Sequence, residues 1–146
     1  MSDRELPITI RQGAESDMGF ILASFTRELH KTIPYNFIPN STFFPHYTAL
    51  LHSLVAKSTV LVATVEDSPD DLVGFLIAQP LTESSVVVHW SQVKHIFQHM
   101  GVFKALLEAF GCEGKTIVCS HYFTLFPKIR DRYHMIYDPF VLDGGV

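Results

Sequence analysis

The stretch VKHIFQHMGVFKALLEAFG, residues 93–111, follows the unbroken apolar run VVVHW at 86–90 and decides how the fold is interpreted. Its second half, GVFKALLEAFG, spaces apolar residues as a buried helix does and ends in Gly111, a residue favoured just after a last helical turn. Its first half has no regular period and contains a single glycine, Gly101. The pattern predicts a strand, a loop and a helix. The loop is either a ragged helix start or a phosphate-binding loop that has lost glycines.

The segments on either side of this stretch alternate between strand and helix patterns. Strands are predicted over 6–13, 58–67, 70–80, 83–93, 115–123 and 136–145, and helices over 14–30, 47–58, 101–111 and 124–135. The segment 31–47 is aromatic and interrupted by Pro34, Pro39 and Pro45, so a loop is predicted there. SPDD at 68–71 is predicted to form a hairpin turn. This order predicts a mixed α/β sheet with helices on both faces.

Composition and charge restrict the class of protein. A chain of 146 residues with 47% hydrophobic residues can enclose a core, and one domain over 1–146 is predicted. The net charge is -4 and the basic residues are scattered, so nucleic acid is not expected as a partner. The apolar runs are too short to span a membrane, and the start lacks a signal-peptide pattern. We expect a soluble, cytoplasmic protein in which Cys112 and Cys119 are free thiols.

Residues in three segments of the sequence match motifs of a known protein family. In it, a Val-x-Pro-x-x-Arg/Gln-Gly-x-Gly-x-Gly/Ala-x-x-Leu-Leu motif joins the fourth strand to the third helix. The residues of this chain that fall in register with the motif are Val93, Gln98, Gly101, Leu106 and Leu107. Arg11 and Asp17 match the family's common opening, and Gly74 matches a frequent glycine of its third strand. On this evidence the chain resembles the GNAT superfamily of acyl-CoA-dependent N-acyltransferases, over roughly 8–142.

The resemblance implies a mostly antiparallel sheet in which the fourth strand splays from the fifth at a bulge. It also implies acetyl-CoA as the co-substrate. The main chain of Ser91, Gln92 and Val93 is expected to bond the pantetheine arm between the splayed strands. The pyrophosphate is expected to lie against the loop and the helix start, where main-chain N–H groups and the helix dipole favour an anion. The residues expected there are Gln98, His99, Met100, Gly101, Val102, Phe103 and Lys104.

The loop also departs from the family pattern. His95 replaces the usual proline, and His99 replaces the first glycine. Phe103 occupies a position that is normally glycine or alanine, and its ring either turns into the core or intrudes on the cofactor. Lys104, just inside the helix, can contribute a phosphate contact that offsets part of the loss.

Acetyl transfer to an amine requires a base, an acid for the departing thiolate and a donor for the oxyanion. His89 is the predicted base, because it lies on the fourth strand, shares a face with Ser91 and Val93, and titrates near neutrality. The alternative is a half-buried strand histidine with a satisfied hydrogen bond. The N–H of Val93 is the predicted oxyanion donor. For the acid, Phe126 replaces the family's usual tyrosine, so Tyr133 is preferred and Tyr122 is the alternative.

Two other patterns in the sequence each have more than one interpretation. His95 and His99 are four residues apart, as in some zinc sites, but a third ligand is missing nearby and no metal is predicted. The aromatic residues of 31–47 can shape an acceptor pocket, or they can cap the core or form a homodimer contact.

The sequence therefore predicts an N-acetyltransferase that moves an acetyl group from acetyl-CoA to a primary amine of a small molecule or peptide by direct attack. A catalytically silent module of the same fold, which senses a CoA derivative or binds protein, is the main alternative. A non-enzymatic oligomeric protein built on the aromatic segment is a third.

Overall fold

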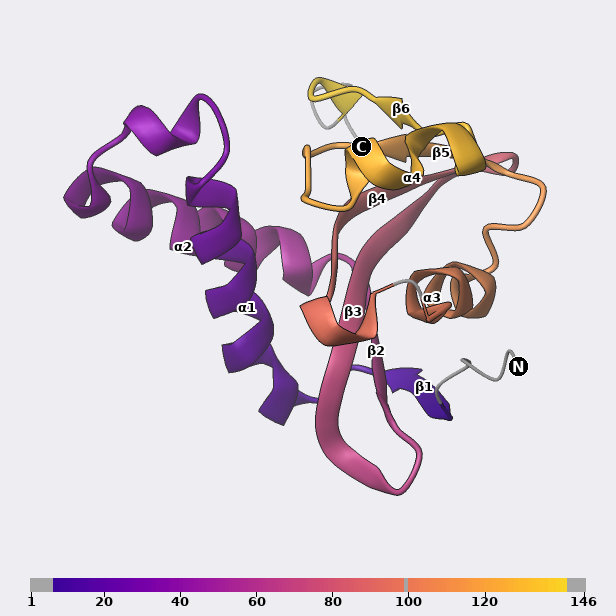
Figure 1. Ribbon diagram of the computed structural model, residues 1–146. Helices are drawn as coiled ribbons and strands as arrows, with labels where there is room; N and C mark the ends of the chain where they lie inside the picture. The colour runs from indigo at the N-terminus through magenta and orange to yellow at the C-terminus, as the bar shows by residue number, and fades with distance from the viewer. Residues whose placement is uncertain (1–6, 99, 142–146) are drawn as a thin grey trace.

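The computed structural model describes residues 7–98 and 100–141 (Figure 1). Its strands are β1 (Ile8–Gln12), β2 (Thr59–Val65), β3 (Ser68–Thr82), β4 (Ser85–Val93), β5 (Thr116–Cys119) and β6 (Ile136–Tyr137). Its helices are α1 (Glu15–His30), α2 (Asn40–Ala56), α3 (Val102–Phe110) and α4 (Phe126–Tyr133), with short 3-10 turns η1 (Tyr35–Phe37) and η2 (His95–Phe97). The predicted order of strands and helices is confirmed.

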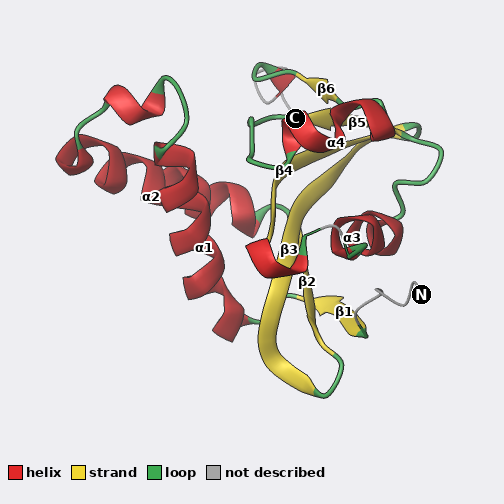
Figure 2. Cartoon of the chain, in the orientation of Figure 1, coloured by secondary structure: helices red, strands yellow, loops and turns green. Residues whose placement is uncertain are grey.

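The strands form one sheet in the order β1-β2-β3-β4-β5-β6. Neighbours are antiparallel from β1 to β4, whereas β4–β5 and β5–β6 are parallel. Helices α1 and α2 lie on one side of the sheet and α3 lies on the other (Figures 1 and 2). The predicted mixed sheet with helices on both faces is therefore confirmed. None of the described helices is long and apolar enough to cross a membrane.

The central strands are covered on both faces, which explains why their sequences are almost continuously apolar. Residues 60–64 of β2, 73–78 of β3 and 86–91 of β4 are all buried. Apolar side chains of α1 and α3 complete the core from the two sides; these are Ile21, Phe25, Leu29, Val102, Leu106 and Leu107. The position of any group on β4 is therefore fixed by packing on both faces.

The Arg11–Asp17 pair fixes the junction between β1 and α1. Asp17 is buried, accepts two guanidinium hydrogen bonds from Arg11 at 2.7 and 3.2 Å, and accepts a third from the N–H of Ala14 at 2.7 Å. Its hydrogen bonds to Arg11 lower the pKa of the carboxyl group. Arg11 also donates to the carbonyl of Pro69, so the same guanidinium ties the β2–β3 hairpin to the start of α1.

Helix α2 differs from the prediction, because it starts at Asn40 instead of 47 and contains Pro45. Pro45 lies in the second turn, where it removes the hydrogen bond that the amide at 45 would donate to the carbonyl of Ser41, so packing must offset that loss. That packing comes from Phe43, which is fully buried and stacks on Tyr47 with ring centroids 4.7 Å apart. Phe37, by contrast, is 77% exposed. The aromatic residues thus mainly cap the core between α1 and α2.

Three boundaries also differ from the prediction. The hairpin turn is Glu66–Asp67, and SPDD belongs to β3, because Val65 pairs with Ser68. β5 ends at Cys119 instead of 123, and β6 contains only Ile136–Tyr137. In each case polar or proline residues follow immediately, and apolar content alone does not show where pairing stops.

Candidate functional site

Strands β4 and β5 separate part of the way along β4. They pair from Ser85–Thr116 to Val88–Cys119, and the N–H of Ser120 donates to the carbonyl of Val88 at 3.1 Å. β4 then continues to Val93, while β5 has ended. The edge of β4 beyond Val88 therefore has no strand partner within the described ranges. This is the predicted divergence of the fourth and fifth strands.

A β-bulge lies where the strands separate. Trp90 pairs with Ile77 and Val88 pairs with Ala78, so His89 is the extra residue. A bulge changes the normal alternation of side chains along a strand. The indole of Trp90 stacks on Phe25 of α1 with centroids 4.7 Å apart.

The bulge also turns His89 toward α1 and α2. Its ring bonds the side chain of Gln79, whose amide in turn donates to the carbonyl of Lys57 at the end of α2. Val93, in contrast, packs beside Val102 of α3 over Gly74 on the opposite face. The prediction that His89 shares a face with Ser91 and Val93 is wrong, because it assumed uninterrupted alternation.

His89 is fully buried, and both ring nitrogens have partners. Nε2 lies 2.6 Å from Oε1 of Gln79, and Nδ1 lies 2.7 Å from Oγ of Ser120. Burial, followed by the effect of His121, lowers the pKa of His89 to about 3, so the ring is neutral at pH 7. This is the satisfied strand histidine that the sequence left as an alternative. The ring is enclosed and hydrogen-bonded to Gln79 and Ser120.

The unpaired edge of β4 presents main-chain groups. The N–H of Lys94 donates to the carbonyl of Val73 in β3 at 2.8 Å. Main-chain groups alternate between the two edges of a strand, so the amides of Ser91 and Val93 face away from β3. They point to the side that β5 has left, whereas Gln92 faces β3. The geometry suits the predicted main-chain contacts of Ser91 and Val93.

The loop after β4 is held in shape by its own side chains. Gln98 donates from Nε2 to the carbonyl of Val93 at 3.1 Å. Gly101 adopts φ 81°, a left-handed conformation that favours glycine, and forms the N-cap of α3. The first intrahelical bond runs from Ala105 N to Gly101 O, so the amides of 102–104 have no partner within α3 and can bind an anion there. His99 lies outside the described residues, and Met100 is half-buried.

A cleft of about 420 Å³ opens at this loop. It lies between the end of β4, the start of α3 and one face of α4. Its lining is Val93, Phe97, Gln98, Gly101, Val102, Phe103, Lys104, Leu125, Lys128, Ile129, Arg132 and Tyr133. The structure thus gathers most of the residues predicted for the cofactor, together with the preferred acid, into one cavity.

Three cations surround the cleft: Lys104 of α3 and Lys128 and Arg132 of α4. All three are exposed, and none forms a salt bridge with an acidic residue in the described part of the chain. Lys128 and Arg132 did not emerge from the sequence analysis. Their spacing of four residues in a predicted helix, which places both on one face, is the signal that could have identified them.

The aromatic residues of the site occupy different environments. Phe103 is 8% exposed and packs against Phe123 and Tyr133, so its ring turns into the core beneath the cleft. Tyr133 is half-buried and lines the cleft, with its ring edge-on to Phe103 at 5.6 Å. Tyr122 is 43% exposed, packs on Phe126 and is not part of the lining. Of the two candidate acids, only Tyr133 reaches this cavity.

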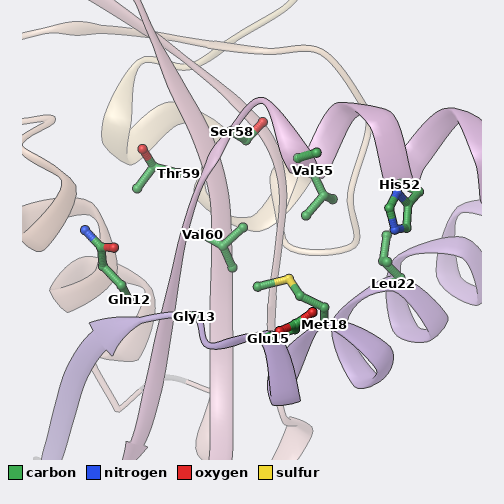
Figure 3. A pocket seen from close by; sticks show the side chains of 11 residues that line it. Gln12, Gly13, Glu15, Met18, Leu22, His52, Val55, Ser58, Thr59 and Val60 are labelled. Atoms are coloured by element: carbon green, nitrogen blue, oxygen red, sulfur yellow. The ribbon is translucent and has the colours of Figure 1, made fainter.

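A second cleft of about 420 Å³ lies on the α1–α2 side, where the end of β1 meets the start of β2 (Figure 3). Gly13 is required there, because a Cβ atom would approach Met18 Cε and Val60 Cγ1 to 2.9 Å. None of the predicted site residues that the structure describes lines it. Among the described residues no group of three or more His, Cys, Asp or Glu side chains could hold a metal ion.

Comparison with known proteins places the fold. No family model and no curated protein matches the sequence. A candidate acetyl transferase from Pyrococcus furiosus is 19% identical, with a TM-score of 0.63 over 86% of this chain and 91% of that one. A possible acetyltransferase from Clostridium difficile 630 is 15% identical, with a TM-score of 0.56 over 88% of each chain. The chain therefore has the fold of the GNAT acetyltransferases, as its sequence pattern predicted.

Proposed function

We propose that the protein binds acetyl-CoA in the cleft between α3 and α4 and transfers the acetyl group to a primary amine. The observation that carries the proposal is the coincidence of three features at one place. These are the unpaired edge of β4, the free amides at the start of α3 and a ring of cations. Each suits a different part of an acyl-CoA.

The chain's own residues fit the diphosphate although the loop has few glycines. The amides of 102–104 and the positive end of the α3 dipole point at one anion site. Lys104, Lys128 and Arg132 add positive side-chain charge at the same cleft. Because the ring of Phe103 packs away into the core, it leaves the N-terminus of α3 open. Side-chain charge therefore compensates for the closer contact between main chain and diphosphate that glycines normally allow.

The chemistry follows from what lies beside the thioester, which acetyl-CoA supplies as the activated acyl group. The amide of Val93 faces the unpaired edge and is placed to donate to the oxyanion as the amine attacks. Tyr133 lines the same cleft and is placed to protonate the departing thiolate. His89 acts indirectly, through its hydrogen bonds to Gln79 and Ser120. The acceptor is a small-molecule or peptide amine.

The alternative is a silent module of the same fold that binds CoA without transferring the acetyl group. It is favoured by Phe126, which is buried and occupies the position where the family has a tyrosine. Calorimetry with acetyl-CoA and with CoA, followed by turnover assays on a panel of amines, separates the two. Binding with turnover supports the transferase, and binding without turnover supports the silent module. No heat at millimolar ligand overturns both.

A further inference from the structure

A chain of four polar side chains crosses the sheet beside the bulge, on the face of α1 and α2. Gln79 Oε1 lies 2.6 Å from His89 Nε2, and His89 Nδ1 lies 2.7 Å from Ser120 Oγ. Ser120 Oγ lies 2.8 Å from Nδ1 of His121. The residues come from β3, β4 and the segment after β5, so the chain bridges the two strands at the point where they separate.

The donors and acceptors of these side chains give the row of hydrogen bonds a direction. Gln79 donates its amide nitrogen to the carbonyl of Lys57, so its oxygen faces His89. An amide oxygen can only accept, and His89 Nε2 must therefore carry the proton. The neutral ring then has its lone pair on Nδ1, which accepts from Ser120.

The direction continues to His121. The hydroxyl of Ser120 has one proton, already donated to His89, so it must accept from the Nδ1–H of His121. A neutral His121 consequently has its lone pair on Nε2. His121 is partly exposed and lies edge-on to Phe25 with ring centroids 5.6 Å apart. The hydrogen bond to Ser120 and the contact with Phe25 thus hold the ring of His121 beside the point where β4 and β5 separate.

We propose that His121 is the base of the acetyl transfer, and that Ser120, His89 and Gln79 are positioning residues that fix its tautomer. This proposal rests on the proposed function. It also predicts that the amine approaches from the side of α1 and α2, opposite the cleft lined by α3 and α4. The sequence pattern predicted His89 as the base, whereas the structure buries His89 and leaves Nε2 of the partly exposed His121 as the ring nitrogen with a lone pair.

His121 and Tyr133 move the protons of the acetyl transfer. The amine nitrogen forms a bond to the carbonyl carbon, and its N–H bond breaks as Nε2 of His121 takes the proton. The C–S bond breaks, and the thiolate receives a proton from Tyr133. The Nδ1–H bond from cationic His121 to Ser120 becomes charge-assisted and strengthens. His121 then returns its proton to water, and the tyrosinate of Tyr133 takes a proton from water, which restores both side chains.

The surroundings keep the base neutral before the reaction. Burial lowers the pKa of His121 to about 4, against a smaller opposing effect of the main-chain carbonyl of His89. The titratable group facing it from β4 is His89, and α1 presents the ring of Phe25. No charged side chain in the described ranges contributes to the pKa of either ring. The lone pair is therefore present throughout the neutral pH range.

The first test needs no substrate. In ¹⁵N-histidine-labelled protein at pH 7, long-range proton–nitrogen spectra should show His89 as the Nε2–H tautomer and His121 as the Nδ1–H tautomer. Ser120→Ala should release His121 to a mixture of tautomers. An Nε2–H tautomer of His121 in the parent protein, directed at the His89 carbonyl, would overturn the proposal whether or not turnover is found.

The second test uses turnover with acetyl-CoA and an amine from the panel. His121→Gln should lower kcat at least 10-fold and leave the KM for acetyl-CoA unchanged, whereas His46→Gln, at an exposed histidine of α2, should change neither. Full kcat in His121→Gln would reject the role of His121. Failure of the parent to bind acetyl-CoA would instead reject the proposed function, with the tautomers still measurable.

Gln79→Glu tests the positioning role through the pH dependence of kcat, which a purely structural role of these residues would not change. A carboxylate at Gln79 favours protonated His89, whose Nδ1–H would then donate to Ser120 and reverse the direction of the chain. His121 would become the Nε2–H tautomer and lose its lone pair. The kcat of this variant should fall at least 10-fold as the pH is lowered through the neutral range, whereas the kcat of the parent should fall only near pH 4, where His121 itself is protonated. A pH dependence of kcat equal to that of the parent would contradict the proposed role of these hydrogen bonds.

Discussion

Gln98 donates a side-chain hydrogen bond to the carbonyl of Val93 across the turn between β4 and α3, with an N–O distance of 3.1 Å. This bond holds the loop in the shape that exposes the first amides of the helix. We expect Gln98→Ala to weaken acetyl-CoA binding about 2- to 10-fold, the range for one net hydrogen bond. Calorimetry tests this, with the exposed Gln12→Ala as the matched control. Equal affinity for both variants would show that the loop keeps its shape without the bond.

The cations at the cleft make a second prediction. Replacing Lys104, Lys128 or Arg132 with glutamine should weaken acetyl-CoA binding by about 3- to 10-fold each, because each removes a charge-assisted phosphate contact. The triple variant should also lose most of the salt dependence of the dissociation constant, since screening acts on these charges. Lys57→Gln, an exposed lysine at the end of α2, serves as the control. A salt dependence that survives in the triple variant would place the diphosphate elsewhere.

The sequence predicted the elements better than it predicted the site. Gly111 ends α3 in a left-handed conformation with φ 94°, as its position indicated, because helix termination depends on local backbone chemistry. The face of His89 could not be predicted, since the bulge arises from pairing with Ile77 and Ala78, which lie more than ten residues away. The same holds for Ser120, which meets His89 only through the parallel pairing of β4 with β5. Contacts between strands depend on register, and strands that are buried on both faces lack the apolar–polar alternation from which register can be predicted.

Burial of His89 also makes the stability of the protein depend on pH. Its pKa is about 3 in the folded chain, against an ordinary value of 6.5. Between these pH values the unfolded chain binds a proton that the folded chain does not, so the contribution is complete above pH 6.5 and is lost as the pH falls toward 3. The expected slope is about 1.4 kcal/mol per pH unit for this group.

Urea unfolding at pH 7, 6, 5 and 4 measures that slope. His89→Gln should be less stable at pH 7, because it disturbs a buried network, but its stability should fall less between pH 6 and pH 4. His121, whose pKa is lowered to about 4, adds to the slope in both proteins, so the variant flattens it without removing it. Parallel curves for the two proteins would mean that His89 is protonated equally in the folded and unfolded states.

Tyr133 is the candidate acid that lines the cleft. We expect Tyr133→Phe to lower kcat by about 100-fold. The substitution removes the hydroxyl that protonates the thiolate and leaves the aromatic ring in place. Affinity for acetyl-CoA and the free energy of unfolding should change little. Tyr122→Phe should retain kcat, since Tyr122 packs outside the lining on Phe126. A loss confined to Tyr122→Phe would exchange the two roles.

Phe103 occupies the position where the family motif has a small residue, and its packing decides what a small residue would do here. Its ring is 8% exposed and contacts Phe123 and Tyr133, so removing it opens a cavity beneath the cleft. Phe103→Ala should cost about 3–5 kcal/mol of unfolding free energy, and Phe103→Gly somewhat more because glycine is a poor helix former. Both should weaken acetyl-CoA binding, since Tyr133 and the start of α3 lose their support.

Phe110→Ala, at the half-buried end of α3, should cost less unfolding free energy and leave acetyl-CoA binding unchanged. Tighter binding in Phe103→Gly would mean that the ring obstructs the diphosphate, and that the cleft described for the free protein is narrower than the one the ligand requires.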